Sequence, residues 1–149
     1  MKVLIATDGS EYSKRAIQES CRFLANTKDA EIKVLSIYKC LDPMPTVPFV
    51  IPENYPSQFS QEAEKEARKI VREAAHIIIQ KYPEIELTAD IEKLSVGTVG
   101  QKIIEKTKEW EADLIVVGSH GRGFWGRLAM GSTSDDVVHQ ASCPVLVVH

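Results

Sequence analysis

The sequence predicts an α/β protein built on a doubly wound, five-stranded parallel sheet with helices on both faces. Short runs rich in Val, Leu and Ile, without polar alternation, recur along the chain, and such runs are typical of strands buried on both faces of a parallel sheet. Between them lie segments with apolar residues at helical spacing. Because the two patterns alternate from end to end, right-handed crossovers are expected to place helices on both faces.

The first half of the chain supplies two strands, a helix and a long connection. Lys2–Thr7 is predicted to be the first strand, and the turn sequence Asp8–Ser10 follows it. Ser13 is expected to cap the next helix, whose apolar positions repeat at helical spacing. Ile32–Tyr38 is predicted to be the second strand. Five of the seven prolines fall within Lys39–Ser60, so this segment is predicted to be a long loop with a functional role.

The second half continues the alternation and ends on a very apolar strand. One of its strands alternates apolar with polar residues, as a strand at a sheet edge does. Glycine and threonine precede one helix, and a glycine follows one buried strand. The predicted elements are helix Gln61–Tyr82, edge strand Leu87–Leu94, a helix that Gly97-Thr98 opens, strand Asp113–Val117, helix Ser132–Gln140 and terminal strand Pro144–Val148.

Composition and charge exclude several classes of protein. With 44% hydrophobic and 26% charged residues the chain has the mix of a soluble globular protein. Eighteen basic and 21 acidic residues give a charge of −3, unlike the basic surface that nucleic-acid binding requires. No segment resembles a membrane span or a signal peptide, and the cysteines and histidines lack metal-ligand spacing. We therefore expect one cytoplasmic domain at residues 1–149 that binds neither nucleic acid nor membrane and holds no metal through its own side chains.

Glycine is concentrated in one segment, where five of the eight glycines fall within fourteen residues. Gly118–Gly121 follows a predicted buried strand, and Gly131 stands at a predicted helix start. Glycine permits a positive φ and lets backbone N–H groups approach a ligand, while a helix start favours anions. The segment is also basic, with His120, Arg122 and Arg127. It lacks the P-loop lysine, and the first turn lacks G-x-G-x-x-G. We expect a site for a phosphorylated ligand; the alternative is a purely structural glycine loop with a helix cap.

The spacing Gly-x2-Gly-x9-Gly-Ser at Gly118, Gly121, Gly131 and Ser132 is similar to the ATP-binding signature of the universal stress protein family. The resemblance covers the whole chain and implies a doubly wound domain with strand order 3-2-1-4-5. One branch of that family lacks the signature and does not bind ATP, so the intact signature places this chain with the ATP-binding branch. The resemblance extends to VLIATDGSEYSKRAI at Val3–Ile17, ADLIVVGSHGRG at Ala112–Gly123 and CPVLVVH at Cys143–His149.

The resemblance also implies roles for single residues around ATP, ADP or AMP, with or without Mg²⁺ or Mn²⁺ on the phosphates. Asp8 is expected to bond the nucleoside or a metal-bound ligand, and its alternative role is that of a turn residue bonding its own backbone. His120, Arg122 and Arg127 are candidates for phosphate contacts, against loop packing or solvation as alternatives. No catalytic residue is assigned. The resemblance places Ala6, Thr7 and Asp8 against ribose and adenine, Ile37 at the adenine edge, Val117 and Gly118 along the nucleoside, and Gly121, Gly131, Ser132 and Thr133 at the phosphates.

The terminal strand predicts a homodimer. Pro144–Val148 is short and apolar, and as an edge strand it exposes unpaired backbone unless it pairs with its twin across a two-fold axis. The resemblance implies the same pairing. The leading hypothesis is an ATP-binding stress-response or signalling homodimer, in which the nucleotide shifts the long loop and changes the binding of a protein partner. The alternatives are a slow ATPase or self-phosphorylating enzyme, with Ser132 or Thr133 as acceptor, and a dimeric adaptor that binds no nucleotide.

Overall fold

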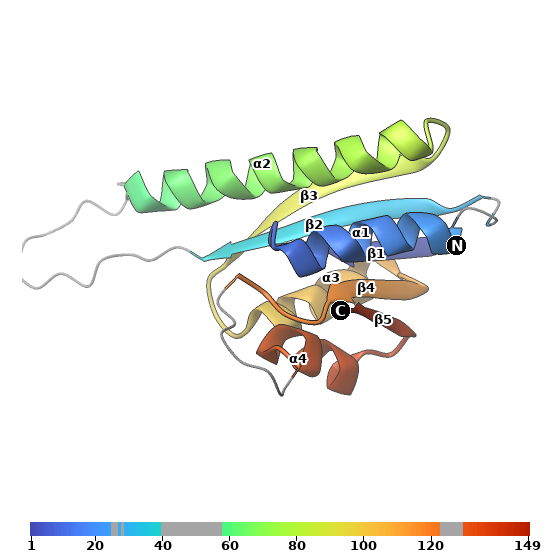
Figure 1. Cartoon of the computed structure of the whole chain (residues 1–149). Coiled ribbons are helices and arrows are strands. Elements are labelled where there is room, and N and C mark those ends of the chain that lie inside the picture. The colour runs from blue at the N-terminus through green and yellow to red at the C-terminus, as the bar shows by residue number, and fades with distance from the viewer. Residues whose placement is uncertain (25–26, 28, 40–57, 123–129) are drawn as a thin grey trace, which may run out of the picture.

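The computed structural model describes residues 1–24, 27, 29–39, 58–122 and 130–149, and every structural statement below concerns this part of the chain. Five strands form one parallel sheet in the order β3-β2-β1-β4-β5 (Figure 1). The predicted fold class and the strand order implied by the resemblance are both confirmed. The strands are β1 (Lys2–Ala6), β2 (Glu31–Lys39), β3 (Glu86–Leu94), β4 (Leu114–Gly118) and β5 (Val145–Val148). The helices are α1 (Glu11–Leu24), α2 (Gln58–Lys81), α3 (Val99–Trp110) and α4 (Ser132–Gln140).

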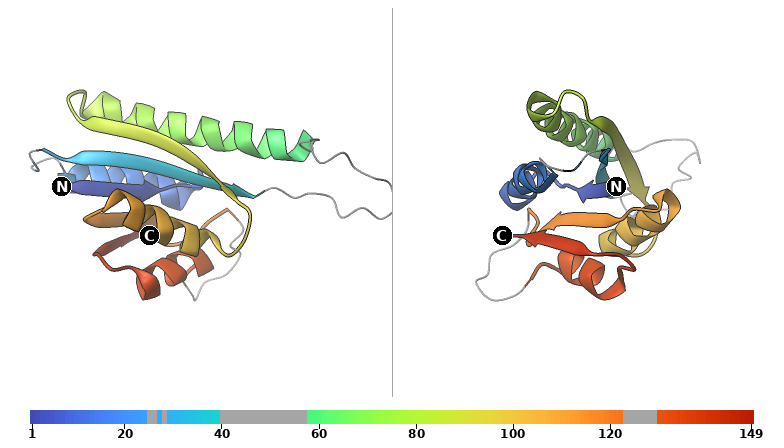
Figure 2. Two further views of the ribbon diagram at one scale, coloured as in Figure 1. Left: turned by 180° about the vertical axis from the view of Figure 1, so that it is seen from behind. Right: turned by 90° about the vertical axis from the view of Figure 1, so that its right-hand side faces the viewer.

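The helices cover the two faces of the sheet in pairs, α1 and α2 on one side and α3 and α4 on the other (Figure 2). Successive residues of β1 point to opposite faces, so Val3 and Ile5 join the core under α1 and α2, whereas Leu4 joins the core under α3 and α4. All three side chains are fully buried. This explains why the central strands read as continuous apolar runs, since both of their faces lie in a core.

The start of α1 shows that Ser13 is not its cap, contrary to the prediction. The helix begins at Glu11, and Ser10 precedes it. The Ser10 hydroxyl accepts a hydrogen bond from the Ser13 N–H at 3.2 Å, and the Ser10 carbonyl accepts one from the Lys14 N–H at 3.0 Å. Ser10 therefore takes the capping role. The Ser10 N–H donates to Asp8 Oδ1 at 3.0 Å, and this bond fixes the backbone just ahead of the helix.

Helix α2 begins at Gln58, so the last three residues of the predicted loop Lys39–Ser60 are helical and the prediction was wrong there. Lys39 closes β2, and residues 40–57 lie outside the described part of the chain. Ala67, Ile70 and Ala74, which stand at helical spacing in this segment, are buried against the core. Pro56 is the last proline before the helix, which fits the exclusion of proline from helix interiors.

Helix α3 begins as the sequence predicts, immediately after Gly97-Thr98. Gly97 adopts a positive φ of 86°, a conformation that glycine reaches without strain. Thr98 forms a capping box with Gln101: its hydroxyl accepts the Gln101 N–H at 3.1 Å, and the Gln101 side chain accepts the Thr98 N–H at 3.0 Å. Both bonds satisfy donors that the helix start leaves without partners.

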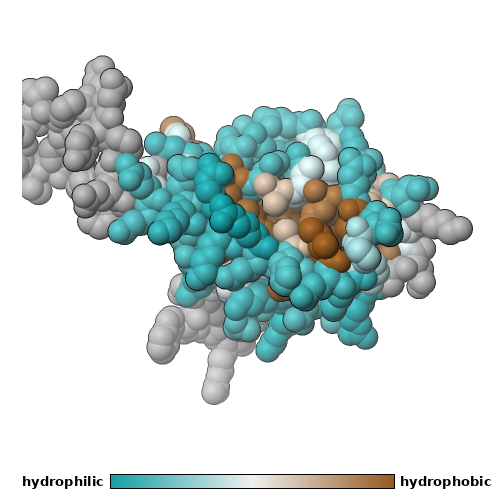
Figure 3. Space-filling model, turned by 90° about the horizontal axis from the view of Figure 1, so that it is seen from above, coloured by the Kyte–Doolittle hydropathy of each residue, from teal (hydrophilic) through white to brown (hydrophobic). Residues whose placement is uncertain are grey.

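The outer surface near α2 is mostly polar. On the face seen from above in Figure 3, the side on which α2 lies in Figure 1, an apolar area is bordered by hydrophilic residues. Among the large apolar side chains exposed on the two helices of this side are Ile79 of α2 and Phe23 of α1. No helix among the described residues has both the length and the apolar character needed to span a bilayer.

Candidate functional site

A cavity of about 410 Å³ opens at the carboxyl ends of β1, β2 and β4, where ligands bind in open parallel sheets. This volume lies in the range of small-molecule sites. Residues from both ends of the sequence meet here, including most of those predicted for the site. The lining residues are Ala6, Thr7, Asp8, Ser13, Leu35, Ile37, Val99, Ile103, Val117, Gly118, His120, Gly121, Gly131, Ser132, Thr133 and Ser134.

The cavity has an apolar part and a polar part. Side chains of β2, α3 and β4 supply the apolar part, in which Leu35, Ile103 and Val117 also belong to the core under α3 and α4. The first turn of α4, together with Gly121 and His120, supplies the polar part. An apolar wall beside a helix N-terminus suits a ligand that joins a flat apolar ring to an anionic group.

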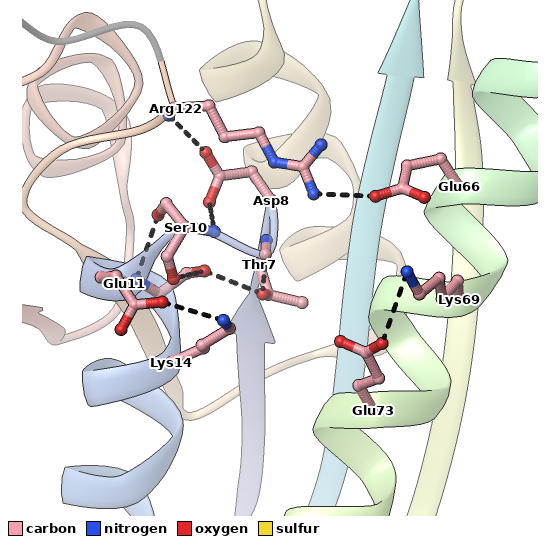
Figure 4. Close-up of polar contacts among 11 residues, drawn as sticks. Thr7, Asp8, Ser10, Glu11, Lys14, Glu66, Lys69, Glu73 and Arg122 are labelled. Atoms are coloured by element: carbon pink, nitrogen blue, oxygen red, sulfur yellow. Dashed lines mark hydrogen bonds and ion pairs between the residues drawn. The ribbon is translucent and has the colours of Figure 1, made fainter.

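The turn between β1 and α1 is rigidly built. The Thr7 hydroxyl donates to Ser13 Oγ at 3.0 Å and accepts the Gly9 N–H at 3.2 Å. Both carboxylate oxygens of Asp8 accept backbone N–H groups, Oδ1 from Ser10 and Oδ2 from Arg122, each at 3.0 Å (Figure 4). The first bond is the turn bond that the sequence suggested as an alternative. The second ties the segment after Gly121 to the end of β1, so Asp8 joins two walls of the cavity.

The signature glycines are needed for close approach rather than for a positive φ. Among the described glycines only Gly9 and Gly97 have a positive φ, so the conformational reason expected for Gly118, Gly121 and Gly131 does not apply. A Cβ on Gly118 would stand 2.8 Å from the Ser13 nitrogen, and one on Gly121 would stand 2.9 Å from an Asp8 oxygen. These glycines therefore let β4, α1 and the β1 turn pack together around the cavity.

The start of α4 presents backbone donors to the cavity. The Gly131 N–H is used within the protein, since it donates to the Ser119 carbonyl at 2.8 Å. The Ser134 hydroxyl lies 2.9 Å from the same carbonyl and 2.8 Å from the Gly131 carbonyl, which holds this turn in place. Within the described residues, the N–H groups of Ser132 and Thr133 donate to no protein acceptor. Together with the positive end of the helix dipole, they form an anion-binding surface.

The three basic candidates have different positions. His120 lines the cavity, with its Nδ1 at 2.9 Å from Ser119 Oγ and its ring 5.0 Å from that of Tyr12. Arg122 is not among the lining residues, because its guanidinium forms an ion pair with Glu66 of α2 at 3.2 Å (Figure 4). Arg127 lies outside the described residues. The described chain contains no group of three or more His, Cys, Asp or Glu placed to hold a metal ion.

Comparison with known proteins gives the family. The family model described as universal stress protein family matches residues 1–149. The chain belongs to the universal stress protein family. Relatives include universal stress protein MJ0531 of Methanocaldococcus jannaschii, 31% identical over 99% of this chain and 81% of that protein. Universal stress protein A homolog 2 of Coxiella burnetii is 29% identical over 99% of this chain and 93% of its own length.

Several solved structures share the fold. The structure of hypothetical protein MJ0577 aligns with a TM-score of 0.79 at 22% identity, over 99% of this chain and 94% of that one. Two others contain a nucleotide. A universal stress protein in complex with cAMP aligns with a TM-score of 0.70 at 23% identity, over 100% and 96% of the two chains. One from Archaeoglobus fulgidus in complex with dAMP gives 0.70 at 18% identity, over 100% and 98%.

Sequence reasoning missed five lining residues of this universal stress protein. Ser13 and Ser134 are buried serines one turn into α1 and α4, where the hydroxyl contacts preceding backbone. The sequence signal available for both was a serine at the third position of a helix that follows a turn. The other three have apolar side chains, and no polar motif marks them. They are Leu35, Val99 and Ile103.

Proposed function

We propose that this universal stress protein binds an adenine nucleotide, with ATP as the first candidate, in the cavity at the carboxyl edge of the sheet. The observation that carries the proposal is the cavity itself, which is lined both by the apolar residues Ile103 and Val117 and by the start of α4 with the N–H groups of Ser132 and Thr133. The family's structures with cAMP and dAMP support an adenine ligand of this kind.

In the proposed complex the base lies against the apolar wall and the phosphates face the start of α4. Ile37 and Ala6, at the ends of adjacent strands, border the base and ribose. The N–H groups of Ser132 and Thr133, which donate to no acceptor in the described part of the chain, and the helix dipole bind the phosphates without a lysine or arginine among the lining residues described. A Mg²⁺ or Mn²⁺ ion carried by the nucleotide would supply the charge neutralisation that these neutral donors leave incomplete.

Calorimetry on protein stripped of nucleotide tests the proposal, with ATP, AMP, cAMP and adenosine as ligands. Ser132→Asp places a carboxylate at the proposed phosphate position, where the helix start tolerates it, and Ser132→Asn is the neutral control of equal size. We expect the acidic variant to lose at least about tenfold in ATP affinity and to bind adenosine unchanged. Absence of binding by every adenine ligand at millimolar concentration refutes the proposal. Analysis of the ATP after incubation decides whether it is hydrolysed or transferred to Ser132 or Thr133.

We further propose that residues 1–149 form one domain that assembles as a homodimer through β5. This strand pairs with β4 on one side, and its other edge meets no described strand. The Pro144 and Val148 carbonyls face β4, since they accept the N–H groups of Ile115 and Ser119. By the alternation of a strand, the backbone of Val147 faces outward.

Val147→Pro tests this pairing, because it removes one outward N–H and leaves the bonds to β4 in place. Val147→Thr, which keeps the N–H and the branched shape, is the control. Light scattering after gel filtration is expected to show a dimer for the control and a monomer, or a more readily dissociating dimer, for the proline variant. A monomeric starting protein contradicts the proposal.

In the dimer, the nucleotide is proposed to act as a conformational ligand in stress signalling, changing the binding of a protein partner.

A further inference from the structure

Arg122, which follows Gly121 of the Gly-x2-Gly-x9-Gly-Ser spacing, contacts α2, and its side chain has no role in the nucleotide site as proposed so far. Its backbone N–H is bonded to Asp8, which lines the cavity, and it directly follows Gly121, which also lines the cavity. Its guanidinium pairs with Glu66 on α2, as Figure 4 shows. The main chain of Arg122 is therefore held beside two residues that line the cavity, while its side chain contacts a separate helix.

Gly9 makes this side-chain position possible. A Cβ at residue 9 would stand 2.6 Å from Arg122 Nη2 and 3.0 Å from Ile70 of α2. The guanidinium thus lies directly across the turn between β1 and α1, next to Asp8. A rotation about its side-chain bonds, with the backbone held by Asp8, would direct the guanidinium toward the cavity instead of toward α2.

The pair with Glu66 is easily broken. The Arg122 and Glu66 side chains are 51% and 47% exposed, and ion pairs in such positions contribute little to stability. Two further ion pairs in Figure 4 each lie within one helix, Lys14 with Glu11 on α1 and Lys69 with Glu73 on α2. Arg122 is thus the cation of this group whose partner lies on a different element, and it adjoins a cavity with no Lys or Arg among its described lining residues.

We propose that Glu66 is a specificity-determining residue that competes with the phosphates of the ligand for Arg122. The inference rests on the proposed function, because it requires a nucleotide in the cavity. A ligand that brings more phosphate charge draws the guanidinium from the Glu66 carboxylate, since a bidentate bond to phosphate is stronger than one exposed carboxylate contact. Adenosine leaves the pair in place. Glu66 therefore lowers the affinity for nucleotides whose phosphates recruit Arg122, leaves the affinity for adenosine unchanged, and so reduces the preference of the site for phosphate.

The exchange also links the ligand to α2. Glu66 lies two turns into α2, and breaking its ion pair removes a contact between this helix and Arg122. A nucleotide with several phosphates would thereby remove one contact that holds the N-terminal half of α2, whereas adenosine would not.

Calorimetry with ATP and adenosine on Glu66→Gln, compared with wild type, tests the inference. Loss of the competing carboxylate is expected to strengthen ATP binding about two- to fivefold and to leave adenosine unchanged. Arg122→Gln is expected to weaken ATP binding about three- to tenfold. In the Arg122→Gln background, the Glu66→Gln change is expected to have no further effect, because the two residues act through one contact.

Glu73→Gln is the matched control, since it removes one exposed carboxylate from the same helix without touching Arg122. Equal strengthening of ATP binding by Glu73→Gln and Glu66→Gln overturns the inference in favour of a general charge effect. Strengthening that persists without Arg122 also overturns it. If wild type binds neither ATP nor adenosine, the proposed function itself fails. If wild type binds ATP and Glu66→Gln leaves the ratio of ATP to adenosine affinity unchanged, only the role of Glu66 is lost.

Discussion

Gly118→Ala is expected to destabilise the protein even without nucleotide. The added Cβ would stand 2.8 Å from the Ser13 nitrogen and 2.8 Å from the Tyr12 carbonyl carbon. Both are backbone atoms of the first turn of α1, so no side-chain rotation relieves the contact. The φ of Gly118 is not in the left-handed region, and alanine can therefore adopt the same backbone. The steric clash is thus separated from any conformational cost.

The magnitude follows from the displacement that the clash requires. Ordinary carbon contacts lie at about 3.5–4.0 Å, so α1 and β4 must separate by more than about half an ångström. Overpacking of this kind costs about 1–3 kcal/mol, and the loss of glycine freedom in the unfolded chain returns about 0.4–1 kcal/mol. The expected net loss is about 1–2 kcal/mol in the free energy of unfolding. For a chain of this length, that corresponds to about 2–8 °C in Tm.

Urea unfolding of nucleotide-free protein, followed by circular dichroism, measures the loss directly. Gly121→Ala is the comparison: its Cβ would stand 2.9 Å from Asp8 Oδ2, the end of a side chain, so the cost should be smaller. The reasoning is refuted if Gly118→Ala abolishes nucleotide binding while the urea midpoint of the nucleotide-free protein stays at the wild-type value. The glycine would then be required by the ligand and not by the packing of α1 on β4.

Three further predictions concern stability and reactivity. Thr98→Ala removes the capping box of α3 and its bond to Asp136, and should lower the free energy of unfolding by about 1 kcal/mol in urea titrations; an unchanged midpoint would contradict the capping role. Burial raises the pKa of the Cys21 thiol, so site-resolved alkylation at pH 8 should modify it only after unfolding, and rapid labelling of native protein would refute this. The hydrogen bond from Lys106 lowers the pKa of the Glu109 carboxyl. The contact therefore stabilises the folded protein at pH values above the usual Glu pKa, and this contribution is lost as the pH falls. The stability difference between wild type and Lys106→Met should therefore be constant from pH 6 to 8 and shrink below about pH 4.5, whereas a difference that grows on acidification would show the opposite linkage.

The fold was predictable because the central strands must be apolar on both faces. Val3, Leu4 and Ile5 alternate between two cores, so their run carries no polar residue, and the same holds for Leu114 to Val117. The apolar pattern does not predict the order of the strands. That order was predicted from the family resemblance, which the glycine spacing carries. Element ends were less predictable. Ser10 and Ser13 stand three residues apart, and the sequence does not show that the helix begins between them, with the Ser10 hydroxyl accepting the Ser13 N–H.

Some residues that line the candidate site were predictable where their chemistry is visible in the sequence. Asp8, Gly121 and Ser132 line the cavity, and they stand in segments that the sequence marks by a turn or glycines after a buried strand and by a helix start, while their individual roles were implied by the resemblance. Val99 could not be found in this way, since its side chain is an ordinary apolar group that lines the cavity only because the start of α3 packs beside it. Apolar lining residues are set by how helices pack, and a single sequence does not show that packing.

Arg122 shows why basic residues in such a segment cannot be assigned from sequence. The sequence indicated that Arg122 either contacts phosphate or is solvated. The structure shows a third arrangement, an ion pair with Glu66 of α2, which stands 56 residues earlier in the sequence. That partner is itself one of four glutamates on α2, and nothing in the sequence distinguishes it from the other three. What distinguishes Glu66 is its distance to Arg122 across the turn that Gly9 leaves open. A glycine outside the Gly-x2-Gly-x9-Gly-Ser spacing thus determines where the cation next to the cavity can lie, and the phosphate preference proposed above depends on that position.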